Sequence, residues 1–407
     1  MTSRRSFLGG AAAGLAATRS FAAKTDSRVP EVEARIARRD FRDLSKEDLP
    51  TPCMVVDLDL FEQNIKKMAN HGKTTGINIR PHVKVHKSVD IAKRQIALGA
   101  IGLTTATMAE SELMSGAGIK GVFWTRQPAG KNNITRAVAL AKRDSTFVIV
   151  ADDPITVDQL EQAAAAAGVK LNVAVDVFAG LTRHGIEAGQ PALELAQKVN
   201  SSKHMRLAGL MGYSGGASHT KGWENRRKKS QNDIAGLLQT VESCKKSGLP
   251  VNFVSGGSTG TYNIDVGSLT ELECGSYIFM DTLYRRVGGK SSDTVYEDFG
   301  PSLTVMTTVV SKRHPRQCTI DAGNKALLRP TDEAKGMPWI TVENQGAEYG
   351  ILKWNDGDRD LKLGERVELY CSNLDMSTNV YDRYYIARGE KIVDVWPIMG
   401  RAGAAQR

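Results

Sequence analysis

Residues 80–87 read RPHVKVHK and crowd two lysines and two histidines into one short segment. The segment follows a β-rich run, so we expect Lys84 to stand at the end of a strand. A lysine that projects into the mouth of a barrel is a candidate nucleophile for a Schiff base. The neighbouring positive charges would lower its pKa by repulsion between like charges. A basic strand end that water merely solvates is the alternative interpretation.

A second chemical feature is the run of small and hydroxyl residues at 255–262, SGGSTGTY. Glycines let backbone N–H groups approach an anion closely, and hydroxyls add further donors. We therefore expect Gly256, Gly257, Ser258 and Thr259 to hold a phosphate, with a flexible loop as the alternative. A lysine at one strand end and a phosphate cradle at another together indicate a pyridoxal 5'-phosphate (PLP) site.

Two further strand ends carry polar residues that would face the same site. Residues 176–185 (DVFAGLTRHG) place Arg183 where it could contact the ring of a cofactor. Residues 211–216 (MGYSGG) place Tyr213 at the border of the same pocket. The ordinary alternatives are an arginine on the surface and a tyrosine at the edge of the core.

A repeating framework must position these segments, and the sequence contains one. From about residue 54, short β-rich runs alternate with helical stretches. The pattern predicts an α/β fold with a (β/α)8 TIM-type barrel, whose catalytic groups gather at the carboxyl ends of the strands. A doubly wound open sheet is the alternative, which the lack of a GxGxxG motif after the first strand disfavours. The expected strands are 54–58, 77–83, 101–105, 122–125, 146–151, 171–177, 207–213 and 251–255.

After residue 287 the helical periodicity fades, and short β-like runs separated by turn residues predict a C-terminal all-β domain. The expected organisation is a PLP-binding (β/α)8 barrel over residues 54–287 and a β domain made of residues 28–53 plus 288–407. The expected strands of this domain are 303–310, 318–321, 339–342, 366–371, 383–387 and 391–396.

Composition excludes several classes of protein. Hydrophobic residues make up 41% and charged residues 24% of the 407 residues, as in ordinary globular domains. The net charge of +9 forms no basic stripe interleaved with aromatics, so we expect no nucleic-acid partner. No apolar run is long enough to predict a membrane span in the mature form. The five cysteines are an odd number and widely spaced, so no disulfide framework is expected.

Residues 1–23 predict a removable export signal. Arg4 and Arg5 precede a Gly/Ala-rich apolar stretch, and residues 20–22 (SFA) offer a cleavage site. The segment resembles a bacterial twin-arginine signal, so we expect the mature protein in the periplasm. A frayed amphipathic helix is the alternative.

Longer strings of the chain resemble a known family. The strings are LPTPCMVVDLDLFEQNI, RPHVKVHKS, GLTTATMAESELMSGAGI, DVFAGLTRHGI, GLMGYSGG, VSGGSTGTYNID, TELECGSYIFMDTLY, TIDAGNKAL and NVYDRYYIARGEKIVDVWPIMGRAG, in this order. They are similar to the D-threonine aldolase and eukaryotic-type D-serine dehydratase family, which resembles alanine racemase in its PLP barrel (fold type III). The resemblance implies a PLP-dependent lyase that cleaves D-3-hydroxy amino acids to glycine and an aldehyde.

The resemblance also implies roles for particular residues. Lys84 would be the Schiff-base lysine, and Lys87 is the second choice. Enzymes of this class are commonly head-to-tail dimers, so a homodimer that acts on a small D-amino acid is expected. The other cofactor contacts implied are Arg183, Tyr213, Gly256, Gly257, Ser258, Thr259 and Tyr277.

The family uses a divalent metal near the C-terminus, held by a His together with a Cys or an Asp. Asp375 is present here, but Asn373 stands where the family has its His. Tyr349 replaces the His of a second family signature. The remaining oxygen donors suit a hard ion such as Mg or Mn, and loss of the metal site is the alternative.

These departures leave three further reactions or roles beside the aldolase. A D-serine or 3-hydroxyaspartate dehydratase would share the cofactor and would need metal help at the hydroxyl. A metal-independent amino-acid racemase would need a second base opposite Lys84, often a tyrosine from the β domain of a partner subunit, for which Tyr349 and Tyr370 are candidates. A PLP-binding protein without turnover is the remaining hypothesis.

Overall fold

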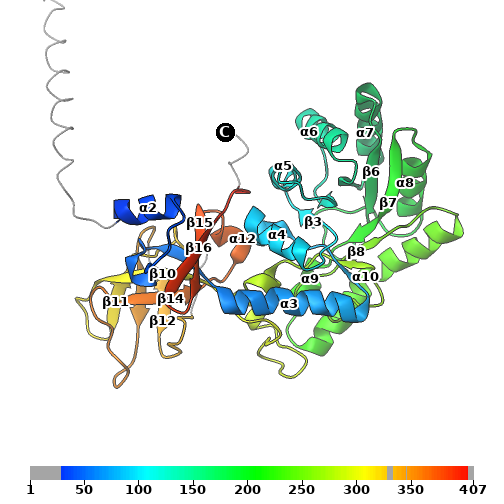
Figure 1. The fold of residues 1–407 in the computed structure, drawn as a ribbon. Coiled ribbons are helices and arrows are strands. Elements are labelled where there is room, and N and C mark those ends of the chain that lie inside the picture. The colour runs from blue at the N-terminus through cyan, green and yellow to red at the C-terminus, as the bar shows by residue number, and fades with distance from the viewer. Residues whose placement is uncertain (1–28, 328–332, 345, 402–407) are drawn as a thin grey trace, which may run out of the picture.

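The computed structural model describes residues 29–327, 333–344 and 346–401, so the expected export signal at 1–23 lies outside the described residues. Figure 1 shows a barrel surrounded by helices beside a β-rich domain. The predicted α/β barrel with a C-terminal all-β domain is confirmed. Within the described ranges, no helix combines the length and the apolar character needed to cross a membrane.

The barrel has eight strands, and all its neighbouring pairs are parallel. It closes between the first and second strands, where the N–H of Thr104 donates to the carbonyl of Pro81 at 2.9 Å. The strands are β2 (Asn78–Ile79), β3 (Leu103–Thr105), β4 (Val122–Trp124), β5 (Val148–Ala151), β6 (Leu171–Asp176), β7 (Met205–Gly212), β8 (Val254–Gly256) and β9 (Glu271–Leu272).

Helices between these strands begin and end at residues that favour helix caps. Thr107 and Glu110 form a capping box in which each side chain accepts from the other's backbone N–H. Asp153 caps a helix that ends at Gly168, which has φ +62°. The helices are α4 (Val89–Ala97), α5 (Met108–Gly116), α6 (Lys131–Arg143), α7 (Pro154–Ala167), α8 (Gln190–Ser201) and α10 (Trp223–Lys246).

The strand expected to open the barrel lies in the other sheet. β1 (Cys53–Asp57) pairs antiparallel with β10 (Leu303–Ser311) and parallel with β15 (Arg383–Arg388). The prediction that 54–58 is a barrel strand is therefore wrong. Residues 53–56 are all buried, and a continuous apolar run reads the same in a barrel and in the middle of another sheet.

The barrel takes its eighth strand from β9 instead, which is two residues long and shows no alternation in the sequence. Each barrel strand after β1 therefore has a number one lower than the sequence led us to expect. Lys84 follows the first barrel strand and the Gly/Ser loop follows the seventh. Loops after the seventh and eighth strands are where barrels of this type commonly bind phosphate.

The β domain is an eight-stranded sheet that joins both ends of the described chain. Val32, Leu44 and Leu49 pack against β1 and β15, and Glu33 accepts a hydrogen bond from Arg383 at 2.8 Å. The sequence did not predict β13. The remaining strands are β11 (Gln317–Ile320), β12 (Thr341–Asn344), β13 (Gly350–Lys353), β14 (Arg366–Tyr370) and β16 (Lys391–Pro397).

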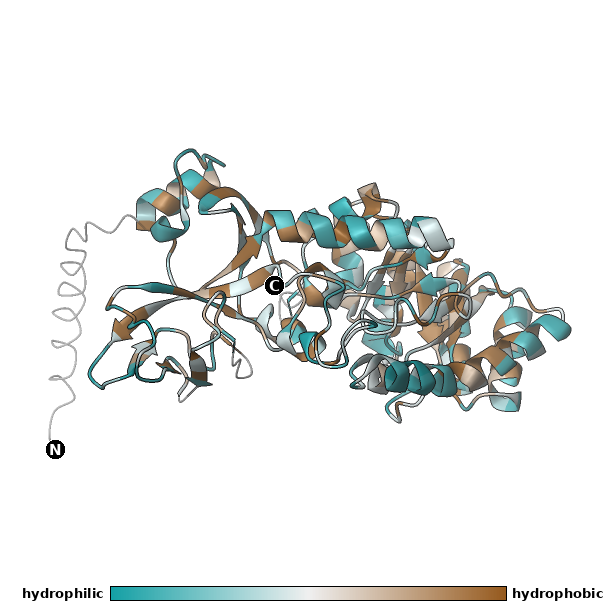
Figure 2. Ribbon diagram, turned by 90° about the horizontal axis from the view of Figure 1, so that it is seen from below, coloured by the Kyte–Doolittle hydropathy of each residue, from teal (hydrophilic) through white to brown (hydrophobic). Residues whose placement is uncertain are grey.

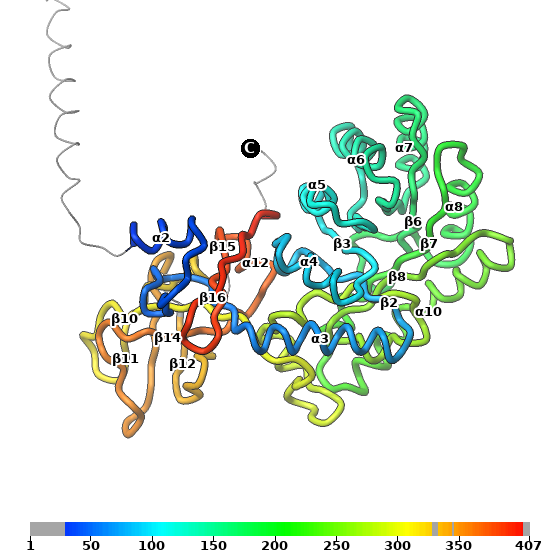
Figure 3. Tube along the Cα trace, viewed as in Figure 1, coloured from blue at the N-terminus to red at the C-terminus, as the bar shows by residue number. Residues whose placement is uncertain are grey.

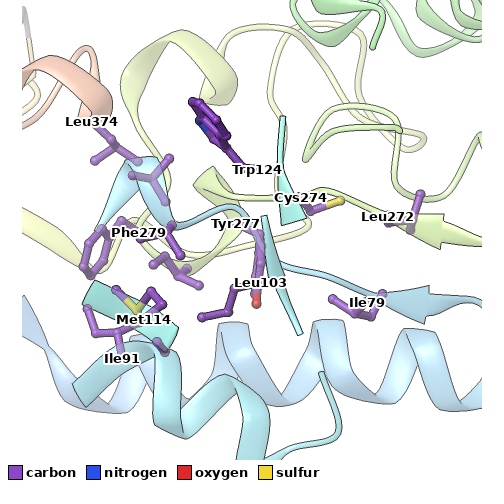
Figure 4. Close-up of a cluster of buried hydrophobic side chains, with 14 of the residues drawn as sticks. Ile79, Ile91, Leu103, Met114, Trp124, Leu272, Cys274, Tyr277, Phe279 and Leu374 are labelled. Atoms are coloured by element: carbon purple, nitrogen blue, oxygen red, sulfur yellow. The ribbon is translucent and has the colours of Figure 1, made fainter. Parts of the chain in front are cut away.

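The largest hydrophobic core runs from the barrel into the β domain. Figure 2 shows brown, hydrophobic strands inside a shell of helices whose outer stretches are teal. Figure 4 shows side chains from separate elements meeting in this core, Ile79 from β2, Leu103 from β3 and Leu374 from the β domain among them. α3 (Leu58–Thr75) continues directly from β1 and also contributes, through Phe61.

A buried ion pair joins the first barrel strand to the last. Nε and one Nη of Arg80 donate to the two carboxylate oxygens of Glu271 at 2.8 and 2.9 Å. The two side chains are 8% and 1% exposed. The guanidinium also lies 5.9 and 5.7 Å from the ring centroids of Phe123 and Phe253. The pair therefore fills the barrel where its first and last strands meet.

Arg80→Met is expected to lower the free energy of unfolding by about 3–5 kcal/mol, because it leaves the Glu271 carboxylate buried without a partner. Urea denaturation followed by circular dichroism measures the loss. The control is Arg136→Met, whose pair with Glu112 is 28% and 32% exposed and should contribute at most about 1 kcal/mol. Equal losses in the two variants would contradict a special role for the buried pair.

Candidate active site

A pocket opens at the carboxyl ends of the barrel strands and is completed by α12 (Leu374–Ser377) of the β domain. It brings together residues that lie far apart in the sequence. The predicted site residues among its lining are Lys84, Arg183, Tyr213, Ser258, Thr259, Asn373 and Asp375.

Lys84 is the middle residue of a single 3-10 turn, η2 (Val83–Val85), that follows β2. The buried side chains of Val83 and Val85 anchor the turn, so the lysine between them faces the pocket. Its Nζ lies 3.7 Å from Oδ2 of Asp375 and 5.6 Å from the ring centroid of Tyr213.

The charge environment of Lys84 differs from the expectation. Burial acts against the charged amine, but the electrostatic influence of Tyr213 and Asp375 outweighs it and raises the pKa of Lys84. The prediction that the pKa of Lys84 is lowered is wrong, because the carboxylate of Asp375, far away in the sequence, faces the amine. Burial holds the pKa of His82 well below its usual value, so this imidazole is neutral. Lys84 is therefore an ammonium paired with a carboxylate before any cofactor binds.

Lys87, the second choice, does not face the pocket. Its Nζ donates to the carbonyl of Lys84, to the carbonyl of Asp375 at 3.0 Å and to Oγ1 of Thr378 at 2.8 Å. Burial lowers the pKa of Lys87 to about 8. Of the two lysines in this segment, only Lys84 can meet a ligand in the pocket.

The loop after β8 brings two of its four predicted phosphate contacts, Ser258 and Thr259, to the pocket. Gly256 and Gly257 are not part of the lining. Gly257 has φ +71°, a conformation that favours glycine, and a Cβ at Gly256 would lie 2.4 Å from the carbonyl of Gly212 on β7. On the neighbouring wall, Gly275 packs closely on the turn that carries Lys84, because a Cβ there would lie 3.2 Å from Val85.

Tyr277 is near this loop only through its backbone. Its N–H donates to Oγ1 of Thr259 at 3.0 Å. The phenol ring is buried in the hydrophobic core shown in Figure 4, where its hydroxyl accepts a hydrogen bond from Gln95 at 2.9 Å. The structure therefore does not bring the ring of Tyr277 to the site, in contrast to the expectation.

Arg183 is held by neighbours that the sequence did not single out. Its Nε donates to Nε2 of His184 at 2.9 Å, and Nδ1 of His184 lies 2.6 Å from Oδ2 of Asp176. Asp176 also accepts from Gln127 at 2.7 Å, and burial raises its pKa. These contacts hold Arg183 with its guanidinium carbon 5.7 Å from the ring centroid of Tyr213.

The expected metal donors have other partners. Oδ1 of Asn373 accepts from the N–H of Met376 at 3.0 Å and so caps α12. Oδ2 of Asp375 faces the Lys84 ammonium. Tyr349 is 56% exposed and is not part of the pocket lining. In the described part of the chain, no three His, Cys, Asp or Glu side chains gather into a ligand set. These donors do not fit the metal that the family resemblance implies.

The two tyrosines considered as the second base of a racemase do not line the pocket of their own chain. Tyr370 lies against Arg285, with the guanidinium carbon 5.0 Å from its ring centroid, and is not among the pocket residues. Tyr349 is outside the pocket as well. Either tyrosine could reach the site only from a partner subunit.

Sequence reasoning missed other pocket residues. His219 follows the short helix α9 (Gly215–Ser218), and its ring centroid lies 4.4 Å from that of Tyr284, at the pocket mouth. Burial by the pocket walls and the charge of Lys84 lower the pKa of His219. Burial raises the pKa values of Glu273 and Asp281 to about 7. No helical or strand periodicity in the sequence marks these residues, because they lie on loops and short turns that lead into the pocket.

Comparison with known proteins agrees with this geometry. Residues 56–283 match the family model of the alanine racemase N-terminal domain, and residues 302–387 match that of a serine dehydratase domain. A 3-hydroxy-D-aspartate aldolase of Paracoccus denitrificans is 32% identical, over 88% of this chain and 94% of the relative. A D-threonine aldolase of an Arthrobacter species is 30% identical, over 86% and 92%.

Solved structures show the same relationship. The D-threonine aldolase of Filomicrobium marinum superposes with a TM-score of 0.83 at 31% identity, covering 88% of this chain and 97% of that one. An alanine racemase of Clostridium difficile shares the fold, with a TM-score of 0.64 at 16% identity. The resemblance inferred from the sequence strings is confirmed: the chain belongs to the D-threonine aldolase and D-serine dehydratase-like family of alanine racemase-type barrels.

Proposed function

We propose that this protein is a PLP-dependent lyase that cleaves D-3-hydroxy amino acids into glycine and an aldehyde. One observation carries the proposal: Lys84, the loop at Ser258 and Thr259, and a histidine kept neutral face one pocket at the carboxyl ends of the barrel strands. Relatives that are aldolases of D-threonine and of 3-hydroxy-D-aspartate support it.

The residues present fit PLP. Lys84 would bind its aldehyde carbon, Ser258 and Thr259 would receive its phosphate, and Arg183 would lie against its ring. The hydrogen bond from the N–H of Tyr277 to Thr259 holds this loop against the pocket, and the hydroxyls of Ser258 and Thr259 are donors suited to an anionic group. When bound, PLP supplies an electron sink for the bond that breaks at the substrate's Cα.

Retro-aldol cleavage also requires a base that accepts the proton of the 3-hydroxyl group and a donor that returns a proton to Cα, so that glycine is formed. His219 fits the role of the base because its lowered pKa keeps the imidazole neutral near neutral pH. Tyr284, against which His219 lies, keeps its phenol protonated because burial raises its pKa well above the usual value. The pair therefore offers an acceptor and a donor at the mouth of the pocket.

Dehydration places a different demand on the site, because the hydroxyl must leave with its electron pair and needs an acid or a metal ion. Asn373 and Asp375 are engaged in a helix cap and an ion pair. Tyr284 could supply the acid, so the pocket alone does not decide between the two reactions. Relatives that are 32% and 30% identical are aldolases, and we therefore favour aldol cleavage. Because Asn373 and Asp375 have other partners, we propose that it proceeds without a divalent metal.

The deciding experiment incubates the PLP-loaded, chelator-treated protein with D-threonine, D-serine and D-3-hydroxyaspartate, with and without added Mn or Mg. We expect glycine and the aldehyde to form at rates within about twofold with and without metal, since no ion is needed to polarise the hydroxyl. Chiral chromatography identifies the products.

Each other outcome points elsewhere. Activity that requires restored metal would overturn the metal-free proposal and retain the aldolase. Ammonia with a keto acid would identify a dehydratase, and L-enantiomers would identify a racemase.

Two further proposals concern the setting of the enzyme. The twin-arginine string at 1–23 supports export to the periplasm. Exposed apolar side chains beside the pocket mouth, Leu283 and Met376, support a homodimer in which a second copy covers them. Cell fractionation and light scattering of the purified protein test these two statements.

A further inference from the structure

We propose that Lys87 is a positioning residue that holds the pocket lysine Lys84 and the carboxylate Asp375 at their separation across the boundary between the barrel and the β domain. The proposal rests on the proposed function, because it assumes that Lys84 binds PLP and that Asp375 faces the substrate. It gives a role to the lysine that the pocket leaves unused.

The donors of the Lys87 ammonium are fully engaged. An ammonium has three N–H groups, and the structure places three acceptors around it: the carbonyls of Lys84 and Asp375 and the hydroxyl of Thr378. One acceptor belongs to the turn after β2, one to Asp375 in α12 and one to Thr378, the residue that caps the end of α12. A single side chain therefore links the turn that carries one pocket residue to the helix that carries the other.

The Lys87 side chain and one of its partners are buried. Lys87 is 4% exposed and Thr378 is fully buried, whereas the contacts with the two carbonyls are partly buried. None of the three acceptors is a carboxylate oxygen, so hydrogen bonds to neutral groups hold the ammonium. Removing it would leave a buried hydroxyl and two partly buried carbonyls to find other donors.

The backbone of Lys87 joins a third segment to the same point. Its φ of +53° lies in the left-handed region, and its N–H donates to the carbonyl of Val83 at 2.8 Å. Its own carbonyl accepts from the N–H groups of Met399 and Gly400 at 2.9 and 3.0 Å. A Cβ at Gly400 would lie 3.2 Å from the Cβ of Lys87, so the C-terminal segment packs directly on this residue.

Figure 3 shows the arrangement in the chain trace, with α12 next to the segment that leads into α4. The barrel and the β domain could shift relative to each other here, and such a shift would change the 3.7 Å separation of Lys84 and Asp375. Catalytic groups must be held within a fraction of an ångström to remain effective. Lys87 thus sets a distance in the pocket without touching a ligand there.

The test compares Lys87→Met with Thr378→Val, which removes one acceptor, and with Thr378→Ser, which keeps it. The matched control is Lys46→Met, because Lys46 is 7% exposed but pairs with Glu368 in the β domain, outside the pocket. Each full-length protein is loaded with PLP. The measurements are the Kd for PLP, the visible circular dichroism of the bound cofactor, kcat and KM.

Lys87→Met is expected to raise the Kd for PLP and to lower kcat, each by about tenfold, with KM nearly unchanged, because misplacement by an ångström costs up to about a hundredfold. The dichroism of the bound cofactor should change as well. Thr378→Val should change these values in the same direction, and Thr378→Ser and Lys46→Met should leave them as in the wild type.

A folded Lys87→Met with wild-type Kd, dichroism and kcat would overturn the proposal, as would equal losses in Lys46→Met. If Lys87→Met does not fold, the threonine pair decides: equal behaviour of Thr378→Val and Thr378→Ser overturns it. If the wild type cleaves no D-3-hydroxy amino acid, the proposed function fails. The Kd and the dichroism then still decide the role of Lys87.

Discussion

Lys84→Ala is expected to abolish the covalent attachment of PLP and to lower kcat/KM by about a thousandfold or more, as removal of a covalent catalytic group does. Lys84 is the lysine whose Nζ faces the pocket, and the other lysine of the segment is tied to backbone carbonyls. Reduction with borohydride followed by mass spectrometry of peptides identifies the lysine that carries the cofactor.

The control is Lys66→Ala, which removes an exposed lysine on α3 that pairs with Glu62. It should retain both the visible absorbance and the activity. If the label is found on Lys87 in the wild type, or if Lys84→Ala still carries PLP covalently, the assignment of the two lysines is wrong.

His219→Asn is expected to lower kcat by about a hundredfold or more, since loss of a general base typically costs this much. The pH profile gives a sharper test. Only the neutral imidazole accepts a proton, so kcat should fall as the pH drops through the pKa of His219. Because burial lowers that pKa, the fall should begin at a lower pH than for an ordinary histidine.

Asp375→Asn should move this acid limb to still lower pH, because the Asp375 carboxylate raises the pKa of His219. Steady-state kinetics in a series of buffers measures the shift. An acid limb that disappears in Asp375→Asn would instead identify Asp375 as the base. His204→Asn is the control, because His204 lies in the turn after α8, pairs with Glu161 on α7 and is outside the pocket.

The sequence allowed the fold class to be predicted because the barrel strands β4 to β8 repeat as apolar runs between helical stretches. It did not allow the strands to be counted correctly. The apolar residues of β1 are buried in the sheet of the β domain, as they would be in the barrel, so its sequence does not distinguish the two. β9 has too few residues to show a pattern. Long-range pairing, which local sequence does not encode, decided both cases.

The site was predicted as far as chemistry depends on residue type. A lysine and a Gly/Ser loop at strand ends indicated the cofactor pocket. The direction of each side chain depended on packing, so neither the burial of the Tyr277 ring nor the orientation of Lys87 could be read from spacing. His219 was missed because a single turn of helix brings it to the pocket. Asn373 was singled out as a metal donor, but its role as a helix cap was missed because the cap exists only once α12 forms.

The position of β1 has a consequence for how the chain acquires its structure. β1 is made early, yet its two neighbours, β10 and β15, are made only after the whole barrel. Its pairing therefore closes a loop that contains the entire barrel, and the entropy of closure and the high contact order make this step slow. Until then, a strand with four consecutive apolar residues and two unpaired edges is available to other chains, as in other aggregation-prone intermediates. During synthesis, β1 is the segment for which a chaperone would be most valuable.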